Sequence, residues 1–446
     1  MPVGRNDRYQ FDTDREGDTR SPAQRDRDRI LHSSAFRRLA GVTQVIGAAE
    51  EGFLLHNRLT HTLKVAQVAR RIAERLSNTP EAAELVVDPD VVEAAALAHD
   101  LGHPPFGHLA EVALDDAAKP KLSDAFEGNA QSFRIVTKLA RRVPQPELPG
   151  LNLTRATLAA IIKYPWLRTA GGTKRDKKWG AFVTEEKEFK FARALFDPGD
   201  DRKSAEAEIM DWADDIAYSV HDVEDFYRVG VIPLNQLATD QNEVDEFLAG
   251  AFNRRKKDVF DDKYANKPES LVKAFDRVRE YFPRRPFRGL DSDRGTIRVA
   301  TGLMIDLFVK AIHLHVPASP DEDRVIIEPK QEEEVTILKE LTWYYVINNP
   351  SLATQQRGQK RVITRLYNIL ETAALEGKFE LFPNSSRGLL HYAERPDLTN
   401  LDQKEREKRR VVIDLIAGMT ERQALNMYHR LAGVAPGSAF DRIYSA

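Results

Sequence analysis

Two residues that could bind a metal ion, His99 and Asp100, stand at the end of a strongly apolar segment. Residues 91–98 are apolar almost all round, so they predict a buried, central helix. A charged aspartate is rarely buried unless it is paired or bound to metal. The pair could therefore supply a nitrogen and an oxygen ligand from a rigid helix end. For an isolated His-Asp dipeptide, a capped helix with a hydrogen-bonded histidine is the commoner explanation.

More histidines lie close to this pair in the sequence. His103 and His108 follow on a loop whose two prolines and two glycines must interrupt the helix. Glu111 comes three residues after His108, so a helix beginning there would place both on one face. His61 lies on a preceding amphipathic segment, three residues after Arg58. A single histidine on a helix is more often structural than a ligand, but together these residues predict one shared site.

A row of carboxylates follows at 211–225. Positions three or four residues apart align one set of side chains on a helical face: Asp211, Asp214, Tyr218, Asp222 and Asp225. The row contains no lysine or arginine, and like charges in line repel by roughly a few tenths of a kcal/mol per exposed pair. A cation would relieve this repulsion. A solvated acidic face is the alternative.

The residue types in these segments suit one divalent ion per site. Two imidazoles and two carboxylates, from His61, His99, Asp100 and Asp214, are ligands for Mn, Fe, Ni, Co or Zn, with Mg also suitable. Such an ion can polarise a phosphoryl oxygen and neutralise developing charge. The chain contains no cysteine, which excludes thiolate ligands and disulfides.

The elements that must position these residues are predicted to be helices, which gives an all-α fold. Helical spacing of apolar residues predicts helices near 26–39, 59–77, 89–101, 128–142, 203–228 and 299–315. Residues 325–327 are a weak strand candidate, and 168–190 are interpreted as an excursion from the core. The predicted organisation is a mobile arm (1–24), a catalytic core (25–318) and a C-terminal helical region packed on it (319–446).

Composition narrows the class of protein. The 446 residues are 42% apolar and 30% charged, the balance of a soluble globular protein with two or three packed units. The net charge of −3 argues against a general nucleic-acid-binding surface. No stretch approaches the ~20 continuous apolar residues that span a bilayer. We therefore expect a cytoplasmic protein with no membrane contact.

These motifs together resemble the HD-domain metallohydrolase superfamily, whose signature is H…HD…D, and more closely the bacterial deoxyguanosinetriphosphate triphosphohydrolase-like proteins. The matching segments extend from about residue 25 to 432, nearly the whole chain, and are 25–30, 34–39, 43–45, 58–63, 99–108, 213–218, 417–420 and 424–425. The run 99–108 together with Ala213-Asp214-Asp215-Ile216 is the specific part of the match. The resemblance implies an HD-type helical catalytic core.

The resemblance implies an activity and roles for particular residues. The activity is hydrolysis of dGTP, or of several dNTPs, to the deoxynucleoside and inorganic triphosphate. The implied metal ligands are His61, His99, Asp100 and Asp214. The implied catalytic residues are His108, which Glu111 orients beside the α-phosphate, and His103, which contacts phosphate.

Substrate contacts are also implied by the resemblance. Arg58 is similar to a phosphate-clamping arginine, Tyr218 and Asp222 to residues that line the deoxyribose, and Gln44 to a residue that reaches the 3′-hydroxyl. Tyr218 packed on the sugar would leave no room for a 2′-hydroxyl. A triphosphate carries about four negative charges and needs cationic partners. Additional candidates for the outer phosphates are Lys163, Lys187, Lys190 and the cluster 174–178, for which a solvated loop is the alternative.

Partners follow from the same resemblance. It implies a homo-oligomer, a tetramer or hexamer, with dNTPs acting as activators at subunit contacts in some members. Two other functions remain open. The chain could be another HD phosphohydrolase, such as a nucleotidase or phosphodiesterase, which would not need the deoxyribose contacts. It could also be a regulator that binds nucleotides or single-stranded nucleic acid through the arginine-rich segment 20–38.

Overall fold

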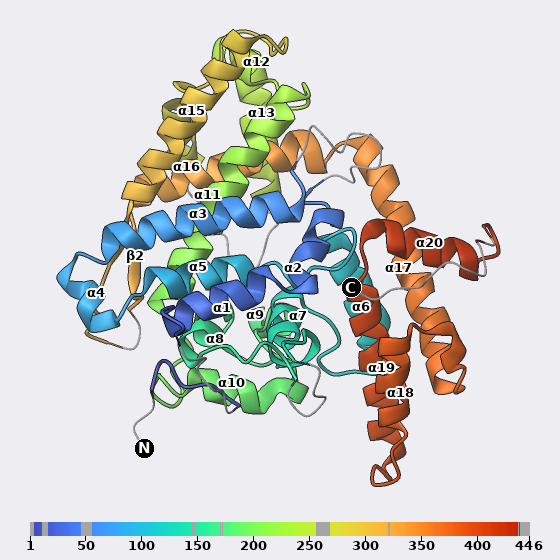
Figure 1. Ribbon diagram of the computed structural model, residues 1–446. Coiled ribbons are helices and arrows are strands. Elements are labelled where there is room, and N and C mark those ends of the chain that lie inside the picture. The colour runs from blue at the N-terminus through green and yellow to red at the C-terminus, as the bar shows by residue number, and fades with distance from the viewer. Residues whose placement is uncertain are drawn as a thin grey trace.

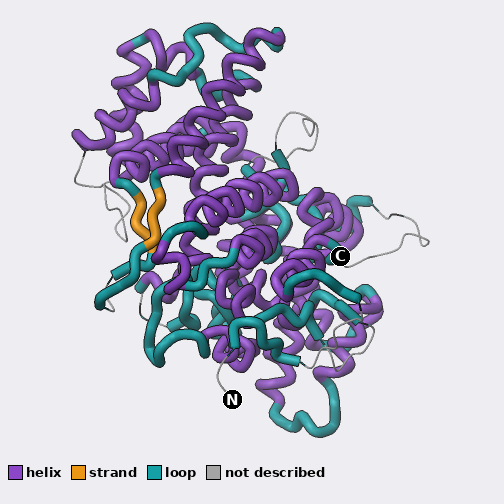
Figure 2. The backbone as a smooth tube through the Cα atoms, turned by 60° about the vertical axis from the view of Figure 1, so that its left-hand side comes forward, coloured by secondary structure: helices purple, strands orange, loops and turns teal. Residues whose placement is uncertain are grey.

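The computed structural model describes residues 4–10, 17–45, 56–143, 149–169, 171, 173–255, 268–319, 322–435 and 437. These residues form the all-α protein that the sequence predicts, with one small two-stranded sheet (Figures 1 and 2). Within them, no helix combines the length and the apolar character needed to cross a membrane.

A buried helix, α5 (Pro89–Ala98), lies at the centre of the helices that carry the candidate site. It packs against α1 (Pro22–Leu31), α3 (Arg58–Leu76), α8 (Arg155–Ile161) and α11 (Ala205–Arg228). Helices α3, α5 and α1 follow one another from top to bottom in Figure 1. Seven of the ten α5 residues are buried, mostly alanine and valine, and their small side chains let helices approach from several directions.

Local signals fix where the site-bearing helices begin. The Asn57 side chain accepts a hydrogen bond from a first-turn backbone N–H at 3.0 Å, which caps α3. Ser204 caps α11 in the same way, and this helix continues unbroken through all the aligned carboxylate positions. Helix α6 (His108–Ala118) begins after Gly107, whose φ of +61° favours glycine.

The remaining elements surround this centre. Short helices occur in the first half of the chain: α2 (Ser34–Arg38), α4 (Pro80–Leu85), α7 (Gly128–Arg134), α9 (Lys174–Lys177) and α10 (Glu186–Arg193). A second set extends toward the top of Figure 1: α12 (Leu234–Thr239), α13 (Gln241–Arg255), α14 (Pro268–Arg279), α15 (Asp291–Lys310) and α16 (Pro329–Leu341). Tighter or wider helical turns occupy Leu39–Gly41, Ile135–Leu139, Val183–Glu185, Thr342–Ile347 and Phe379–Leu381.

The C-terminal helices share a hydrophobic core with α6. They are α17 (Pro350–Leu375), α18 (Asn384–Ala393), α19 (Leu401–Ala417) and α20 (Glu421–Leu431). Buried residues of α17, α19 and α20 pack with Ala110, Ala113 and Leu114 of α6. The helix that begins with His108 is therefore held on one side by the C-terminal region, at the right of Figure 1.

Two predictions about local structure need correction. The predicted helix 299–315 is wrong at its end, because α15 stops at Lys310 and Ile312–Leu314 forms β1. It pairs antiparallel with β2 (Val325–Ile327), with Ile312 opposite Ile327, which confirms the weak strand candidate. Residues 312–314 form a strand because they pair with β2, and the spacing of apolar residues within 299–315 gives no sign of that pairing.

The other correction concerns 168–190, which was interpreted as lying outside the core. Trp179 and Phe182 of this segment are buried against Ala130, so the interpretation is wrong for them. Residues 4–10, within the predicted mobile arm, also contact the core. An Arg8 guanidinium nitrogen lies 2.6 Å from Asp26 Oδ1, and α1 already begins at Pro22.

Candidate active site

The predicted site residues gather around one cleft with a volume of about 420 Å³. Helix α3 contributes Arg58 and His61, the end of α5 contributes His99 and Asp100, and α11 contributes Asp214, and all five residues line the cleft. The loop after α5 and the start of α6 form another wall of it. Segments that are far apart in the sequence therefore converge on one hollow.

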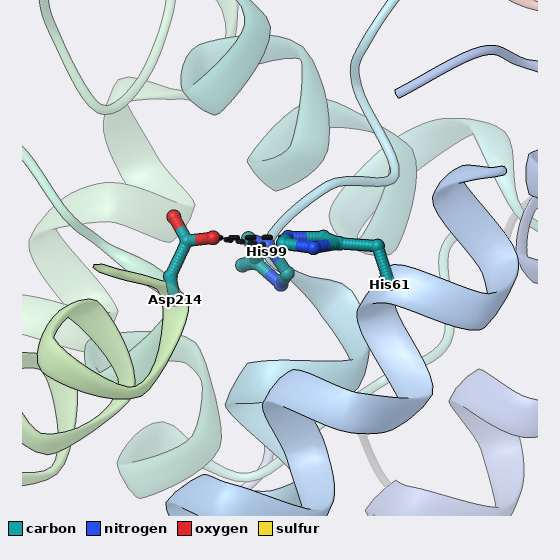
Figure 3. A group of neighbouring side chains, drawn as sticks. All are labelled: His61, His99 and Asp214. Carbon is teal, nitrogen blue, oxygen red and sulfur yellow. Dashed lines mark hydrogen bonds and ion pairs between the residues drawn. The ribbon is translucent and has the colours of Figure 1, made fainter. Parts of the chain in front are cut away.

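Three of the predicted metal ligands come together in this cleft (Figure 3). The ligand atoms of His61, His99 and Asp214 all lie within 4.8 Å of one another. His61 Nε2 is 3.0 Å from Asp214 Oδ1, and His99 Nε2 is 3.7 Å from the same oxygen. Figure 3 shows the two imidazoles and the carboxylate pointing toward one another from three separate helical segments.

The state of His99 fits a metal ligand. Its Nδ1 lies 2.6 Å from the carbonyl oxygen of Ala96, to which it can donate. Its Nε2 is buried without a hydrogen-bond partner, 3.5 Å from Asp100 Oδ1 and 3.7 Å from Asp214 Oδ1, so two carboxylates would stabilise a cation bound at this atom. Burial alone would lower the pKa of His99, but the carboxylates of Asp100 and Asp214 outweigh it and raise the pKa to about 9. The buried Nε2 without a hydrogen-bond partner and the raised pKa both indicate that the space beside His99 Nε2 favours a positive charge.

Asp100 is adjacent to this group but has other partners. Its Oδ2 accepts a hydrogen bond from Arg58 at 2.7 Å, and its Oδ1 lies 3.0 Å from His103 Nδ1. The same Oδ1 is 3.5 Å from His99 Nε2. Burial would raise the pKa of Asp100, but Arg58, His99 and His103 hold it well below its usual range. The carboxylate is therefore ionised, and its role as the fourth ligand stays a prediction.

A second constellation joins His103, His108 and Glu111, whose ligand atoms also lie within 4.8 Å of one another. His108 Nδ1 is 2.6 Å from Glu111 Oε2, as helical spacing predicts. The other oxygen of Glu111 accepts the backbone N–H of Gly128 at 2.7 Å. A Cβ atom at Gly128 would lie only 2.3 Å from that oxygen. Glu111 is thus buried and fixed, whereas the His108 side chain is 74% exposed at the cleft.

Positively charged side chains line the cleft, each beside a carboxylate. Arg58 is 3% exposed and pairs with Asp100. Three lysines follow the same pattern. Lys163 Nζ lies 2.5 Å from Asp211 Oδ1 and 3.2 Å from Asp214 Oδ2. Lys178 Nζ lies 3.0 Å from Glu127 Oε1, and Lys339 Nζ lies 2.5 Å from Asp215 Oδ1. These cations could be redirected to an anionic ligand.

The two other lysines proposed for the outer phosphates are placed differently. Lys190, on α10, is 72% exposed and pairs with Glu186 on its own helix. Neither it nor Lys187 is among the described residues that line the cleft. Of the cluster 174–178, Lys178 alone is among those lining residues. Among the described residues, Lys163 and Lys178 are therefore the predicted phosphate-binding lysines that line the cleft.

The predicted sugar contacts lie at different depths. Gln44 and Tyr218 line the cleft, and Gln44 Oε1 is buried without a hydrogen-bond partner. Asp222 is 3% exposed, one turn further along α11, and is not among the described lining residues. Burial, together with neighbouring Asp225, raises the pKa of Asp222 well above its usual range. The aligned carboxylates are therefore not the solvated acidic face considered as the alternative.

Several lining residues had no recognisable signal in the sequence. They are Tyr164 and Asn129 from the core and Lys339, Gln356, Gln359 and Glu421 from the C-terminal third. None is close in sequence to a predicted metal ligand, although Tyr164 directly follows Lys163, and tertiary packing brings them to the cleft. A helical i, i+3 spacing relates Gln356 to Gln359, but the same spacing occurs on many solvated helices.

Comparison with known proteins finds similarity over nearly the whole chain. Residues 58–219 match the HD domain, and residues 325–430 match the phosphohydrolase-associated domain. The chain is 36% identical to a deoxyguanosinetriphosphate triphosphohydrolase-like protein of Streptomyces coelicolor, with 93% of each chain covered. It is 33% identical to a protein of the same name from Corynebacterium efficiens, with 94% of this chain and 93% of that one covered. A Shewanella protein of that name is 32% identical, with 97% and 96% covered.

Proposed function

This chain belongs to the deoxyguanosinetriphosphate triphosphohydrolase-like family of HD-domain phosphohydrolases, and on that basis we propose that it hydrolyses deoxynucleoside triphosphates to deoxynucleoside and inorganic triphosphate. The substrate is dGTP or several dNTPs. The reaction uses one divalent ion, held by His61, His99, Asp214 and, as the fourth proposed ligand, Asp100.

One observation carries this proposal. A buried His99 Nε2 that has no hydrogen-bond partner, and lies 3.7 Å from Asp214 Oδ1, shares a cleft with a His108–Glu111 pair. The first feature suits a metal ligand, and the second suits proton transfer at a phosphate ester. The cationic side chains of the same cleft match the charge of a triphosphate.

The proposed reaction cleaves the bond between the α-phosphorus and the 5′-oxygen. The oxygen of a water molecule forms a bond to the α-phosphorus, and the 5′-oxygen leaves with the sugar. When bound, the ion would polarise an α-phosphoryl oxygen and neutralise developing negative charge. The remaining tasks belong to this chain's own side chains.

His108 is the proposed proton donor to the departing 5′-oxygen. Its Nδ1 is held by Glu111, which fixes the orientation of the ring and leaves Nε2 for the transfer. The attacking water loses one proton to solvent, and its oxygen stays on the α-phosphorus, which is released as part of the inorganic triphosphate. His103 and Arg58, both beside Asp100, would hold phosphoryl oxygens in line.

Selection of the sugar is assigned to Tyr218, Gln44 and Asp222. The ring of Tyr218 would pack on the deoxyribose and exclude a 2′-hydroxyl, and Gln44 would reach the 3′-hydroxyl. Asp222 is buried behind the cleft surface, and its Oδ2 lacks a partner. A hydroxyl that approached it would satisfy that oxygen.

Product analysis tests the proposal. Purified protein is incubated with each of the four dNTPs, singly and mixed, with Mn²⁺ or Mg²⁺, and the metal content of the same sample is measured. We expect tripolyphosphate and deoxynucleoside. Release of pyrophosphate or orthophosphate would reject the proposed bond, and preference for monophosphates or cyclic nucleotides would select another HD phosphohydrolase. Turnover only in mixtures would indicate a dNTP activator.

We also propose that the chain forms a tetramer or hexamer. Light scattering coupled to size-exclusion chromatography, with and without dNTPs, gives the mass directly. A monomer under both conditions would reject this assignment. Salt-dependent binding of single-stranded nucleic acid without any turnover would instead favour the regulator.

A further inference from the structure

The last helix of the described chain, α20, begins at a residue that joins two loops of the cleft. Oε1 of Glu421 accepts the backbone N–H of Thr43 at 3.0 Å and that of Phe106 at 3.3 Å. Glu421 itself lines the cleft. Thr43 immediately precedes Gln44, and Phe106 lies two residues before His108. One carboxylate oxygen thus connects the loop of the proposed sugar contact to the loop of the proposed proton donor.

The second of these loops has a backbone that needs support. Phe106 has a φ of +69°, in the left-handed region that residues with side chains rarely adopt. Such a conformation persists where surrounding contacts fix it, and it is frequent at functional sites. The hydrogen bond from Glu421 is made at the N–H of this same residue. Losing it would free the loop to leave the strained conformation.

A second contact supports the same loop, and it comes from Arg38 at the end of α2. Buried Arg38 donates to the carbonyl oxygens of Leu101 at 2.6 Å and His103 at 2.8 Å, and also to that of Met419 at 3.1 Å. A Cβ atom at Gly41 would lie 2.6 Å from the Thr420 side chain, so the chain before α20 sits tightly against the N-terminal segment. The loop is therefore held at its carbonyl groups by Arg38.

We propose that Glu421 is a positioning residue for the reaction, which sets the loops of Gln44 and His108 at the correct separation. This inference rests on the proposed function, and it assigns part of the active site to the C-terminal region. Glu421 acts through backbone N–H groups of Thr43 and Phe106. A carboxylate that accepts two N–H groups makes stronger hydrogen bonds than a neutral acceptor.

Steady-state kinetics of three variants test the inference. Glu421→Ala removes the acceptor, and we expect kcat/KM to fall roughly 10- to 100-fold with a higher KM, because both binding and catalytic loops shift. Glu421→Gln keeps an acceptor oxygen and should recover most of the loss. Gln423→Ala is the matched control: Gln423 Oε1 accepts the Thr420 N–H, so this variant weakens the start of the same helix without touching either loop.

The control separates positioning from stability. Partial unfolding lowers the apparent kcat and leaves KM unchanged, whereas loop displacement raises KM. Equal losses in Glu421→Ala and Gln423→Ala at equal melting temperatures would overturn the proposal, and so would an unchanged KM in Glu421→Ala. Failure of Glu421→Gln to recover activity would also contradict the role of the acceptor oxygen.

Hydrogen exchange gives a readout that does not depend on turnover. In Glu421→Ala, the peptides that contain the amides of Thr43 and Phe106 should exchange faster, and in Gln423→Ala they should not. Unchanged exchange in Glu421→Ala would reject the positioning role. If the wild-type protein released no tripolyphosphate, the proposed function would fail, while this exchange measurement would still decide whether Glu421 fixes the two loops.

Discussion

Adding one methyl group at Gly128 should disable the proposed proton donor without unfolding the protein. The new Cβ would lie 2.3 Å from Glu111 Oε1, whereas ordinary contacts are 3.4 Å or longer, so the carboxylate must retreat by about 1 Å. That movement also weakens the 2.7 Å hydrogen bond from the Gly128 N–H and changes the 2.6 Å contact with His108. A misplacement of about 1 Å costs on the order of 100-fold in rate.

The stability of the Gly128→Ala variant should change little. Gly128 is the first residue of α7 and has no positive φ, so alanine there gains about 0.4–1 kcal/mol by lowering the entropy of the unfolded chain. This gain offsets part of the strain at Glu111. We therefore expect kcat for dNTP hydrolysis to fall roughly 100-fold, with a similar melting temperature. Gly302→Ala, within α15, is the matched control, because its added Cβ would meet no atom within 4 Å beyond the backbone of its own helix and its chain neighbours.

A double-mutant cycle shows whether the effect passes through the carboxylate. If Gly128 acts by fixing Glu111, then Gly128→Ala should cost little further activity in a Glu111→Ala background. Additive losses would mean that the methyl group disturbs the cleft by another route. A folded Gly128→Ala enzyme with wild-type kcat would refute the assignment of Glu111 as the residue that orients His108.

Three more predictions address the metal, the sugar and pH. Asp214→Ala removes the carboxylate shared by the two histidines, so the bound divalent metal, measured by elemental analysis, and the turnover should both disappear; retained metal with full turnover would contradict the ligand set. Tyr218→Ala should admit ribonucleotides, and the ratio of kcat/KM for dGTP to that for GTP should fall roughly 10-fold or more; an unchanged ratio would assign sugar selection elsewhere. Burial, aided by nearby Asp323, raises the pKa of Glu208 to about 8. The unfolded carboxyl ionises at a much lower pH, so the free energy of unfolding of the wild-type protein should decline as pH rises toward 8. In urea unfolding, this decline should be on the order of 2–4 kcal/mol larger in the wild-type protein than in Glu208→Gln. Parallel pH profiles would show that Glu208 is ionised in the folded protein.

Local patterns in the sequence were sufficient to locate the central helices. The apolar run before His99 could only be a buried helix, and the 3.6-residue spacing of the carboxylates correctly placed Asp214 and Tyr218 on α11. The i, i+3 spacing of His108 and Glu111 likewise predicted their contact. Each of these features depends on residues that are near one another in the chain.

Features that depend on distant partners could not be predicted in this way. β1 exists because Ile312 pairs with Ile327, and Trp179 is buried because α7 supplies a surface for it. The partners of Asp100 are a further case. Its neighbour His99 marked it as a ligand, but the ion pair with Arg58 arises from the packing of α3 against α5.

Charged residues of the C-terminal region also line the candidate active site, whose predicted ligands lie in the first half of the chain. Asp215 follows Asp214 on α11, and its carboxylate, which lines the cleft, is paired with Lys339 from α16. Burial raises the pKa of Asp215, an effect that Lys339 partly opposes. Without that lysine, an anionic substrate would meet a less balanced negative charge next to the proposed metal ligand. The phosphohydrolase-associated region therefore supplies both backbone support, through Glu421, and compensating charge, and neither can be recognised from the HD segment by itself.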